Sequence, residues 1–239
     1  MNPIGFSTGA LALGDFRKAL GYLVDKPFTV VELSALRVTE LPSLLQGISE
    51  RDLEQFDYVS LHAPSSFGPS EEPEIIRLLG STPVNWKIVL HPDSISNAEY
   101  WRPFGRRLVL ENMDRRKRDA RSTEEMSEWF KILPEAEFCL DLAHAQQWDT
   151  TMTEAYLLLK NFATRLCQVH ISQLDSASRH YPLSEGSIRA FSEVAWLIPG
   201  SIPFIIESRV SPSEMDSEVE KVERIAFSAR ESADHLISA

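Results

Sequence analysis

The amino-acid sequence predicts an α/β protein, a single (β/α)8 TIM barrel of parallel strands that covers residues 1–239 as one domain. Eight short apolar runs recur along the chain, and most start ~20–30 residues apart, the length of one strand, one loop and one helix. The chain length also suits such barrels, which run to ~250 residues. An open doubly wound sheet is the alternative, but it would not need eight strands in strict alternation with helices.

The expected strands lie, in chain order, at residues 4–7, 29–33, 58–62, 87–91, 107–111, 137–141, 166–170 and 203–207. Several are apolar at adjacent positions, such as Ile88, Val89 and Leu90, which is typical of parallel strands covered by helices. The segments between them carry helix signals. A capping-box pattern occupies residues 122–125, residues 211–214 predict the start of the C-terminal helix, and residues 156–162 lie on a further helix.

The charge balance limits the choice of partners. With 24 basic and 35 acidic residues, the chain has a net charge of −11 and repels nucleic-acid phosphates. No apolar run approaches the ~18 residues that span a bilayer, and the N-terminus shows no signal-peptide pattern. We therefore expect a soluble, cytoplasmic protein with no membrane partner and no general nucleic-acid role. The oligomeric state stays open.

The two cysteines, Cys139 and Cys167, form no disulfide framework and suit a reducing compartment. Side chains alternate along a strand. Cys139 stands two residues before Asp141 and is expected to point into the barrel, whereas Cys167 stands three before His170 and is expected to point outward. Both should therefore be free thiols, because a disulfide needs converging Cβ vectors.

Ionisable residues mark the C-terminal ends of seven of the eight expected strands: Glu32, His62, His91, Glu111, Asp141, His170 and Glu207. In a barrel these ends meet on one face, where active sites lie. Loop backbone could satisfy any one of these residues, but so many buried ionisable groups around one mouth would be costly without a shared cation. His144 and His180 follow the sixth and seventh strands and add to the set, whereas His235 is expected to be solvated on the last helix.

Mixed imidazole and carboxylate ligands suit Zn²⁺, Mn²⁺ or Fe²⁺ better than Ca²⁺. Zinc takes ~4 ligands per ion, so eight candidates predict two or three ions bridged by a carboxylate such as Glu111 or Glu207. The eight are His62, His91, Glu111, Asp141, His144, His170, His180 and Glu207. Glu32 is left outside this set, as an acid that either orients a ligand histidine or pairs with Arg37.

Six short segments together resemble the xylose isomerase-like TIM barrels, and most closely the endonuclease IV (AP endonuclease 2) branch. They are Leu61-His62-Ala63-Pro64, Leu90-His91-Pro92, Leu110-Glu111-Asn112, Asp141-Leu142-Ala143-His144, Val169-His170-Ile171 and Ile206-Glu207. Residues 179–188 also resemble the loop after strand seven in that branch.

The resemblance implies three zinc positions. The first would be held by His62, His91 and Glu111, and the second by Glu111, Asp141, His170 and Glu207. The third would be held by His144, His180 and an aspartate two residues before His180, but Ser178 stands there. In place of the aromatic wedge of the DNA-repair members, this chain has Ser65-Ser66-Phe67-Gly68. Together with the acidic charge, this departure argues against a DNA-repair function.

A basic run, Arg115-Arg116-Lys117-Arg118, follows the fifth strand. It is either a solvated loop or a loop that grips a phosphate, since guanidinium groups bind phosphate in a bidentate way. We take Arg115, Arg116, Arg179 and Trp148 as candidate substrate-binding residues.

The leading functional hypothesis is a metal-dependent hydrolase with two or three Zn²⁺ ions, or with Mn²⁺ or Fe²⁺, that acts on a small phosphoester. The alternative is a sugar or sugar-phosphate isomerase or epimerase with one divalent ion, in which Glu111 and Glu207 shuttle protons. Glu111 and Glu207 are the catalytic candidates in both cases. A third possibility is a barrel that binds a metal or ligand without catalysis, although such a barrel has no reason to keep buried histidines.

Overall fold

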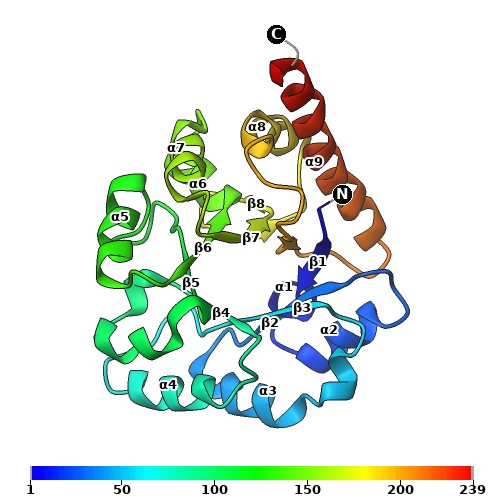
Figure 1. Cartoon of the computed structure of the whole chain (residues 1–239). Helices are drawn as coiled ribbons and strands as arrows, with labels where there is room; N and C mark the ends of the chain where they lie inside the picture. The colour runs from blue at the N-terminus through cyan, green and yellow to red at the C-terminus, as the bar shows by residue number, and fades with distance from the viewer. Residues whose placement is uncertain (1, 238–239) are drawn as a thin grey trace.

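A computed structural model describes residues 2–237, with side chains as far as residue 226. The expected solvation of His235 therefore falls outside the described side chains. Eight parallel strands close into a barrel in the order β1-β10-β7-β6-β5-β4-β3-β2 within this part of the chain, and Figure 1 shows them inside a ring of helices. The (β/α)8 barrel is thereby confirmed, and the open doubly wound sheet is excluded.

The barrel strands are β1 (Ile4–Ser7), β2 (Val30–Ser34), β3 (Tyr58–His62), β4 (Lys87–Leu90), β5 (Leu108–Glu111), β6 (Glu137–Asp141), β7 (Leu166–Ile171) and β10 (Phe204–Ile206). The helices are α1 (Thr8–Ala12), α2 (Phe16–Leu23), α3 (Leu41–Gly47), α4 (Glu72–Gly80), α5 (Thr123–Ile132), α6 (Leu142–Trp148), α7 (Thr153–Phe162), α8 (Glu185–Ala195) and α9 (Met215–Ile237). Each strand lies within one or two residues of its expected position. Because β2 runs on to Ser34, Glu32 lies inside this strand and not at its end.

The two predicted helix starts differ in detail from the sequence patterns. Ser122 caps α5 as expected, because its side chain accepts a hydrogen bond from the amide of Glu125. The Glu125 carboxylate, however, accepts from the amide of Arg121 and not from that of Ser122. At the C-terminal helix, the amide and hydroxyl of Ser211 both donate to the Glu214 carboxylate. This contact closes a turn, and α9 itself begins at Met215.

The barrel interior corrects one prediction about the cysteines. Val89, Val109 and Cys139 form an interior cluster, and Cys167 packs against it. The pairing of β6 with β7 shifts between Phe138 and Cys139, so that Cys139 lies opposite residue 168 instead of 167. Such an irregularity re-aims a side chain, and the expected outward orientation of Cys167 is therefore wrong. Both cysteines are free thiols, as predicted.

A short hairpin in the connection from β7 to α8 was not expected from the sequence. Its strands are β8 (Gln173–Leu174) and β9 (His180–Tyr181), which pair antiparallel. The turn between them contains Ser178, whose backbone has φ +52°. The hairpin thereby places Ser178 and His180 beside the C-terminal end of the barrel. No helix among the described residues is long and apolar enough to cross a membrane.

Candidate metal centre

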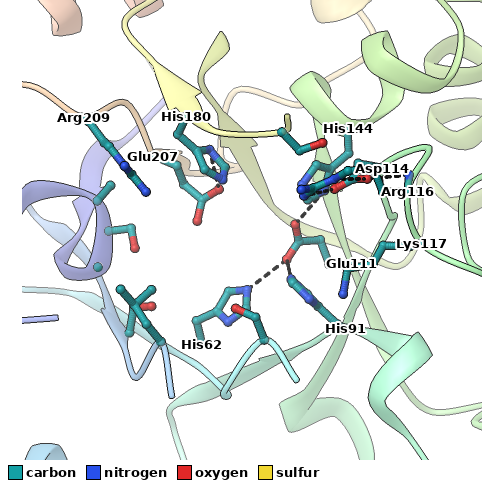
Figure 2. A pocket seen from close by; sticks show the side chains of 17 residues that line it. His62, His91, Glu111, Asp114, Arg116, Lys117, His144, His180, Glu207 and Arg209 are labelled. Carbon is teal, nitrogen blue, oxygen red and sulfur yellow. Dashed lines mark hydrogen bonds and ion pairs between the residues drawn. The ribbon is translucent and has the colours of Figure 1, made fainter. Parts of the chain in front are cut away.

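A cavity of about 250 Å³ opens where the C-terminal ends of the strands meet. Six of the expected ligands line it, as Figure 2 shows for His62, His91, Glu111, His144, His180 and Glu207. The other two, Asp141 and His170, are buried and belong to ligand groups that include Glu111 or Glu207. The structure therefore brings all eight expected ligands to one place.

Glu111 is the central residue of this cluster and is almost fully buried. Its Oε2 atom lies 3.1 Å from His62 Nε2 and 3.5 Å from both His91 Nε2 and His170 Nδ1. Its Oε1 atom lies 3.1 Å from His144 Nδ1. The carboxylate is thus shared by four histidines, which come from β3, β7, the residue after β4 and the helix after β6.

The donor atoms form compact groups suited to a cation. In one group of His62, His91 and Glu111, and in a second of Glu111, Asp141 and His170, the ligand atoms all lie within 4.8 Å of one another. Glu111 belongs to both groups, and Glu32, His170 and Glu207 form a third. Imidazole nitrogens combined with carboxylate oxygens are the donors that Zn²⁺, Mn²⁺ and Fe²⁺ accept.

Several buried polar atoms in these groups lack a hydrogen-bond partner among the described residues: His91 Nδ1, Asp141 Oδ2 and His170 Nδ1. Such an unsatisfied group costs ~1–3 kcal/mol. A cation held between Asp141 and His170 would satisfy two of these atoms together. The residues present therefore fit a bound divalent metal.

The histidine rings also present suitable nitrogens. The Nδ1 atom of His62 lies 2.6 Å from the Ala63 carbonyl and donates its proton there, which leaves Nε2 facing Glu111. For a metal-binding histidine, such an outer hydrogen bond selects the tautomer and fixes the ring orientation.

His170 is oriented from behind by Glu32, and both side chains are fully buried. His170 Nε2 lies 3.0 Å from Glu32 Oε2, and the same oxygen accepts hydrogen bonds from Ser60 Oγ and Gln168 Nε2. Nδ1 of His170 then faces Glu111 and Glu207. Of the two roles considered for Glu32, the structure supports the orientation of a histidine.

Arg37, the other partner considered for Glu32, forms an ion pair with Glu40 instead.

The carboxylates of this cavity stabilise positive charge on the neighbouring histidines. Burial by itself would lower the pKa of His62, but the hydrogen bond to Glu111 and nearby carboxylates raise it to about 9. For His144, Asp141 and Glu111 overcome the same effect and raise its pKa to about 10. Burial raises the pKa of Glu207 to about 7, which lets this carboxyl exchange protons near neutral pH.

The third ligand set implied by the resemblance is not assembled in the described residues. His144 Nδ1 lies 2.9 Å from the carbonyl of Asn112, and His180 Nδ1 lies 2.9 Å from Ser172 Oγ. Ser178 lines the same cavity and donates its hydroxyl proton to Gln147. Among the described residues, neither histidine belongs to one of the compact ligand groups.

The basic loop after β5 has a structural role that the sequence did not reveal. Arg116 forms an ion pair with Asp114 and donates to the carbonyl of Ala177 over 2.7 Å. Arg115 donates to the carbonyl of Ser176. These contacts tie the β5 loop to the turn that carries Ser178.

Of the four expected substrate-binding residues, the structure brings only Arg116 into the cavity lining. Arg115 lies outside the lining, Arg179 forms an ion pair with Asp175, and Trp148 stacks against the Arg121 guanidinium at 4.6 Å from the ring centroid.

Two cationic residues that line the cavity were not assigned to it from the sequence, namely Lys117 and Arg209. Lys117 belonged to the recognised basic run, and it forms an ion pair with Asp93. Arg209 stands two residues after Glu207, and the two-residue alternation of an extended chain was the signal that could have identified it.

Comparison with solved structures finds similar barrels at low sequence identity. Endonuclease IV from Thermus thermophilus is 17% identical with a TM-score of 0.59, over 96% of this chain and 99% of that one. The IolI protein with a bound zinc atom is 15% identical with a TM-score of 0.62, over 94% and 98%. The 3-keto-D-glucoside 4-epimerase YcjR from E. coli is 13% identical with a TM-score of 0.54, over 95% and 100%.

At these identities the similarity establishes the fold. No curated protein matches the chain in sequence. The family model described as the xylose isomerase-like TIM barrel, in contrast, matches residues 44–235, most of the chain. The closed parallel barrel and the ligands at its C-terminal end agree with that match. The protein therefore belongs to the xylose isomerase-like TIM barrel family.

Proposed function

We propose that this protein is a metal-dependent hydrolase that acts on a small phosphoester with a two-ion centre. The observation that carries the proposal is the position of Glu111, whose carboxylate belongs to two compact ligand groups at once. A carboxylate shared in this way is suited to bridge two ions, as in the two-metal sites of many phosphoester-cleaving enzymes. A single-ion enzyme would not need His62 and His91 beside it.

One ion would be held by His62, His91 and Glu111, and the other by Glu111, Asp141 and His170, with Glu207 beside His170. Zn²⁺ is the preferred ion, with Mn²⁺ or Fe²⁺ as alternatives. When bound, such ions activate water and neutralise the charge that develops on the phosphoryl group.

The side chains of the protein would transfer protons and position the ions. Glu207, with its pKa near 7, accepts or donates a proton next to the reacting group. Glu111 holds the two positions in a common geometry. The cavity of about 250 Å³ is below the ~300–1,000 Å³ of drug-sized ligand sites, which favours a small substrate over a nucleic acid. Two free thiols fit a reducing compartment, so we propose a cytoplasmic location.

The second candidate function is a sugar isomerase or epimerase with one ion. Two observations favour it. The third ligand set has Ser178 in place of a carboxylate, and the four residues that a single ion would need, Glu111, Asp141, His170 and Glu207, are all present. Glu111 and Glu207 would then transfer protons on either side of the substrate. An epimerase is among the solved structures with a similar fold.

Metal content separates the two functions. Protein purified without chelators is analysed for metals, together with His62→Ala and His91→Ala, and is assayed against p-nitrophenyl phosphate. The hydrolase requires two ions per chain in the unmodified protein, the loss of one in each variant, and a rate lowered by orders of magnitude. His180→Ala, whose ring lies outside the compact groups, is the matched control and keeps both ions. A single ion that persists in His62→Ala and His91→Ala would refute the hydrolase and favour the isomerase.

A further inference from the structure

We propose that Arg209 is the residue that binds an oxyanion of the substrate, a phosphate or a carboxylate, at the side of the cavity formed by the loop after β10. This inference rests on the proposed function for the existence of a substrate, but its geometric basis is independent of the metal ligands. The basic run after β5, which the sequence suggested for this task, is occupied by other contacts.

The backbone after β10 directs Arg209 into the cavity. Ser208 is fully buried and donates its hydroxyl proton to Glu218 of α9, and Val210 is buried in the hydrophobic core. Alternate side chains of an extended segment point to opposite sides. Glu207 and Arg209 accordingly share the other side, and both line the cavity. Figure 2 shows the Arg209 side chain directed into the cavity beside Glu207 and His180.

The Arg209 guanidinium has no hydrogen bond or ion pair with the protein in the part of the chain with described side chains, residues 2–226. The other cations of the cavity differ in this respect. Arg116 is held by Asp114 and by the carbonyl of Ala177, and Lys117 is held by Asp93. Arg209 therefore keeps all five of its N–H donors available for a ligand.

The chemistry of that ligand follows from the guanidinium group. Its planar fork matches two oxygens of a phosphate or carboxylate, and such charge-assisted pairs are stronger than neutral hydrogen bonds. Arg209 lies across the cavity from Lys117, so a substrate that lies between Glu111 and Glu207 can reach both walls. Arg209 is exposed and stands on the wall of the cavity. Because the whole chain carries a charge of −11, an unpaired arginine at this position selects an anion locally rather than a polyanion over the surface.

The test uses Arg209→Ala and Arg209→Lys in the metal-loaded protein, with Arg77→Ala as a control. Arg77 is exposed on α4 and pairs with Glu74, so this variant removes the same charge away from the cavity. Binding of inorganic phosphate and of acetate is measured by calorimetry, and the metal content of each sample is determined in parallel.

We expect Arg209→Ala to weaken phosphate binding by ~10–100-fold, in line with the ~1.5–3 kcal/mol of a hydrogen bond to a charged group. Arg209→Lys should give an intermediate loss, because it keeps the charge but not the fork. Arg77→Ala should bind phosphate as the unmodified protein does, and all variants should keep the same metal content. A parallel loss of acetate binding would extend the site to carboxylates.

The proposal is overturned if the unmodified protein binds neither anion, if Arg209→Ala binds phosphate normally, or if Arg77→Ala loses as much affinity. None of these measurements needs turnover. If p-nitrophenyl phosphate is not hydrolysed while phosphate binding still depends on Arg209, the proposed hydrolase fails and the anion site stands.

Discussion

At the scale of single residues, Glu111 is the position on which the site depends. It contacts His62, His91, His144 and His170. Among the described residues, it is the carboxylate common to the group with His62 and His91 and the group with Asp141 and His170. Glu111→Ala should therefore remove both ions and abolish activity, whichever of the two proposed reactions the protein catalyses. Metal analysis of the purified variant checks this expectation, and retention of one full ion would show that the two positions are independent.

Glu32 should act through His170 and not on a substrate. It does not line the cavity, and its pKa, which burial alone would raise, is held below the ordinary value by the charge of His170. Glu32→Gln keeps the shape but removes this charge, and changes in such outer partners typically cost ~10–100-fold in metal affinity. Competition with a chromogenic chelator should show weaker binding of one ion, with the other unaffected. An unchanged affinity for both would mean that the His170 ring needs no support.

The affinity for metal should rise with pH. The ordinary pKa of His62 is 6.5, and its value in the folded protein is about 9. Protonated His62 therefore stabilises the metal-free fold fully below pH 6.5, and this contribution is lost as the pH rises through about 9. A metal must displace that proton, so the apparent affinity should gain about tenfold per pH unit for each proton released in this window. Titrations at pH 6.5, 7.5 and 8.5 that give one constant affinity would contradict the shift.

At the scale of elements, the hairpin β8–β9 is held by contacts with its neighbours as well as by contacts within its own turn, such as the ion pair of Arg179 with Asp175. Arg116 binds the Ala177 carbonyl, and Gln147 of α6 contacts both the Asp175 carbonyl and Ser178 Oγ. These contacts are with backbone and loop groups, which sequence patterns within one element do not encode.

Arg116→Ala should loosen this turn without removing the anion site. Because the contact to Ala177 is exposed, its loss is expected to cost only ~0.5–1.5 kcal/mol locally. Amide hydrogen exchange over residues 175–179 should accelerate accordingly. Phosphate affinity should fall much less than in Arg209→Ala. A large loss of phosphate binding with unchanged exchange would show that Arg116 is a ligand-binding residue instead.

At the scale of the whole molecule, the metal ions should stabilise the barrel, because their ligands come from β3, β5, β6 and β7 and from the residue after β4. A ligand at 100 times its Kd adds ~2.7 kcal/mol, and ~2–4 °C per kcal/mol for a chain of this size gives a fall in Tm of about 5–11 °C on chelation. Calorimetry with and without EDTA measures this change. Glu111→Ala is the control, since its Tm should not respond to the chelator.

The fold and the ring of candidate ligands could be predicted from the chain alone, and the reason is geometric. Parallel strands of a barrel end on one face whatever their loops do, so the strand-end positions of His62, Glu111 and Asp141 were sufficient to bring them together. The position of Glu207 just after β10 follows from the same rule.

Other features depended on contacts between distant segments. The strand irregularity beside Cys139 turned Cys167 inward, and Ser178 donates its hydroxyl proton to Gln147. Arg116 donates a hydrogen bond to the carbonyl of Ala177, which lies 61 residues away along the chain. Arg209 has no such partner among the described residues. Local patterns report which faces are apolar and where strands end. The hydrogen bonds and ion pairs between different loops at the C-terminal end of the barrel are decided only by the tertiary structure, because the closed sheet is what brings those loops together.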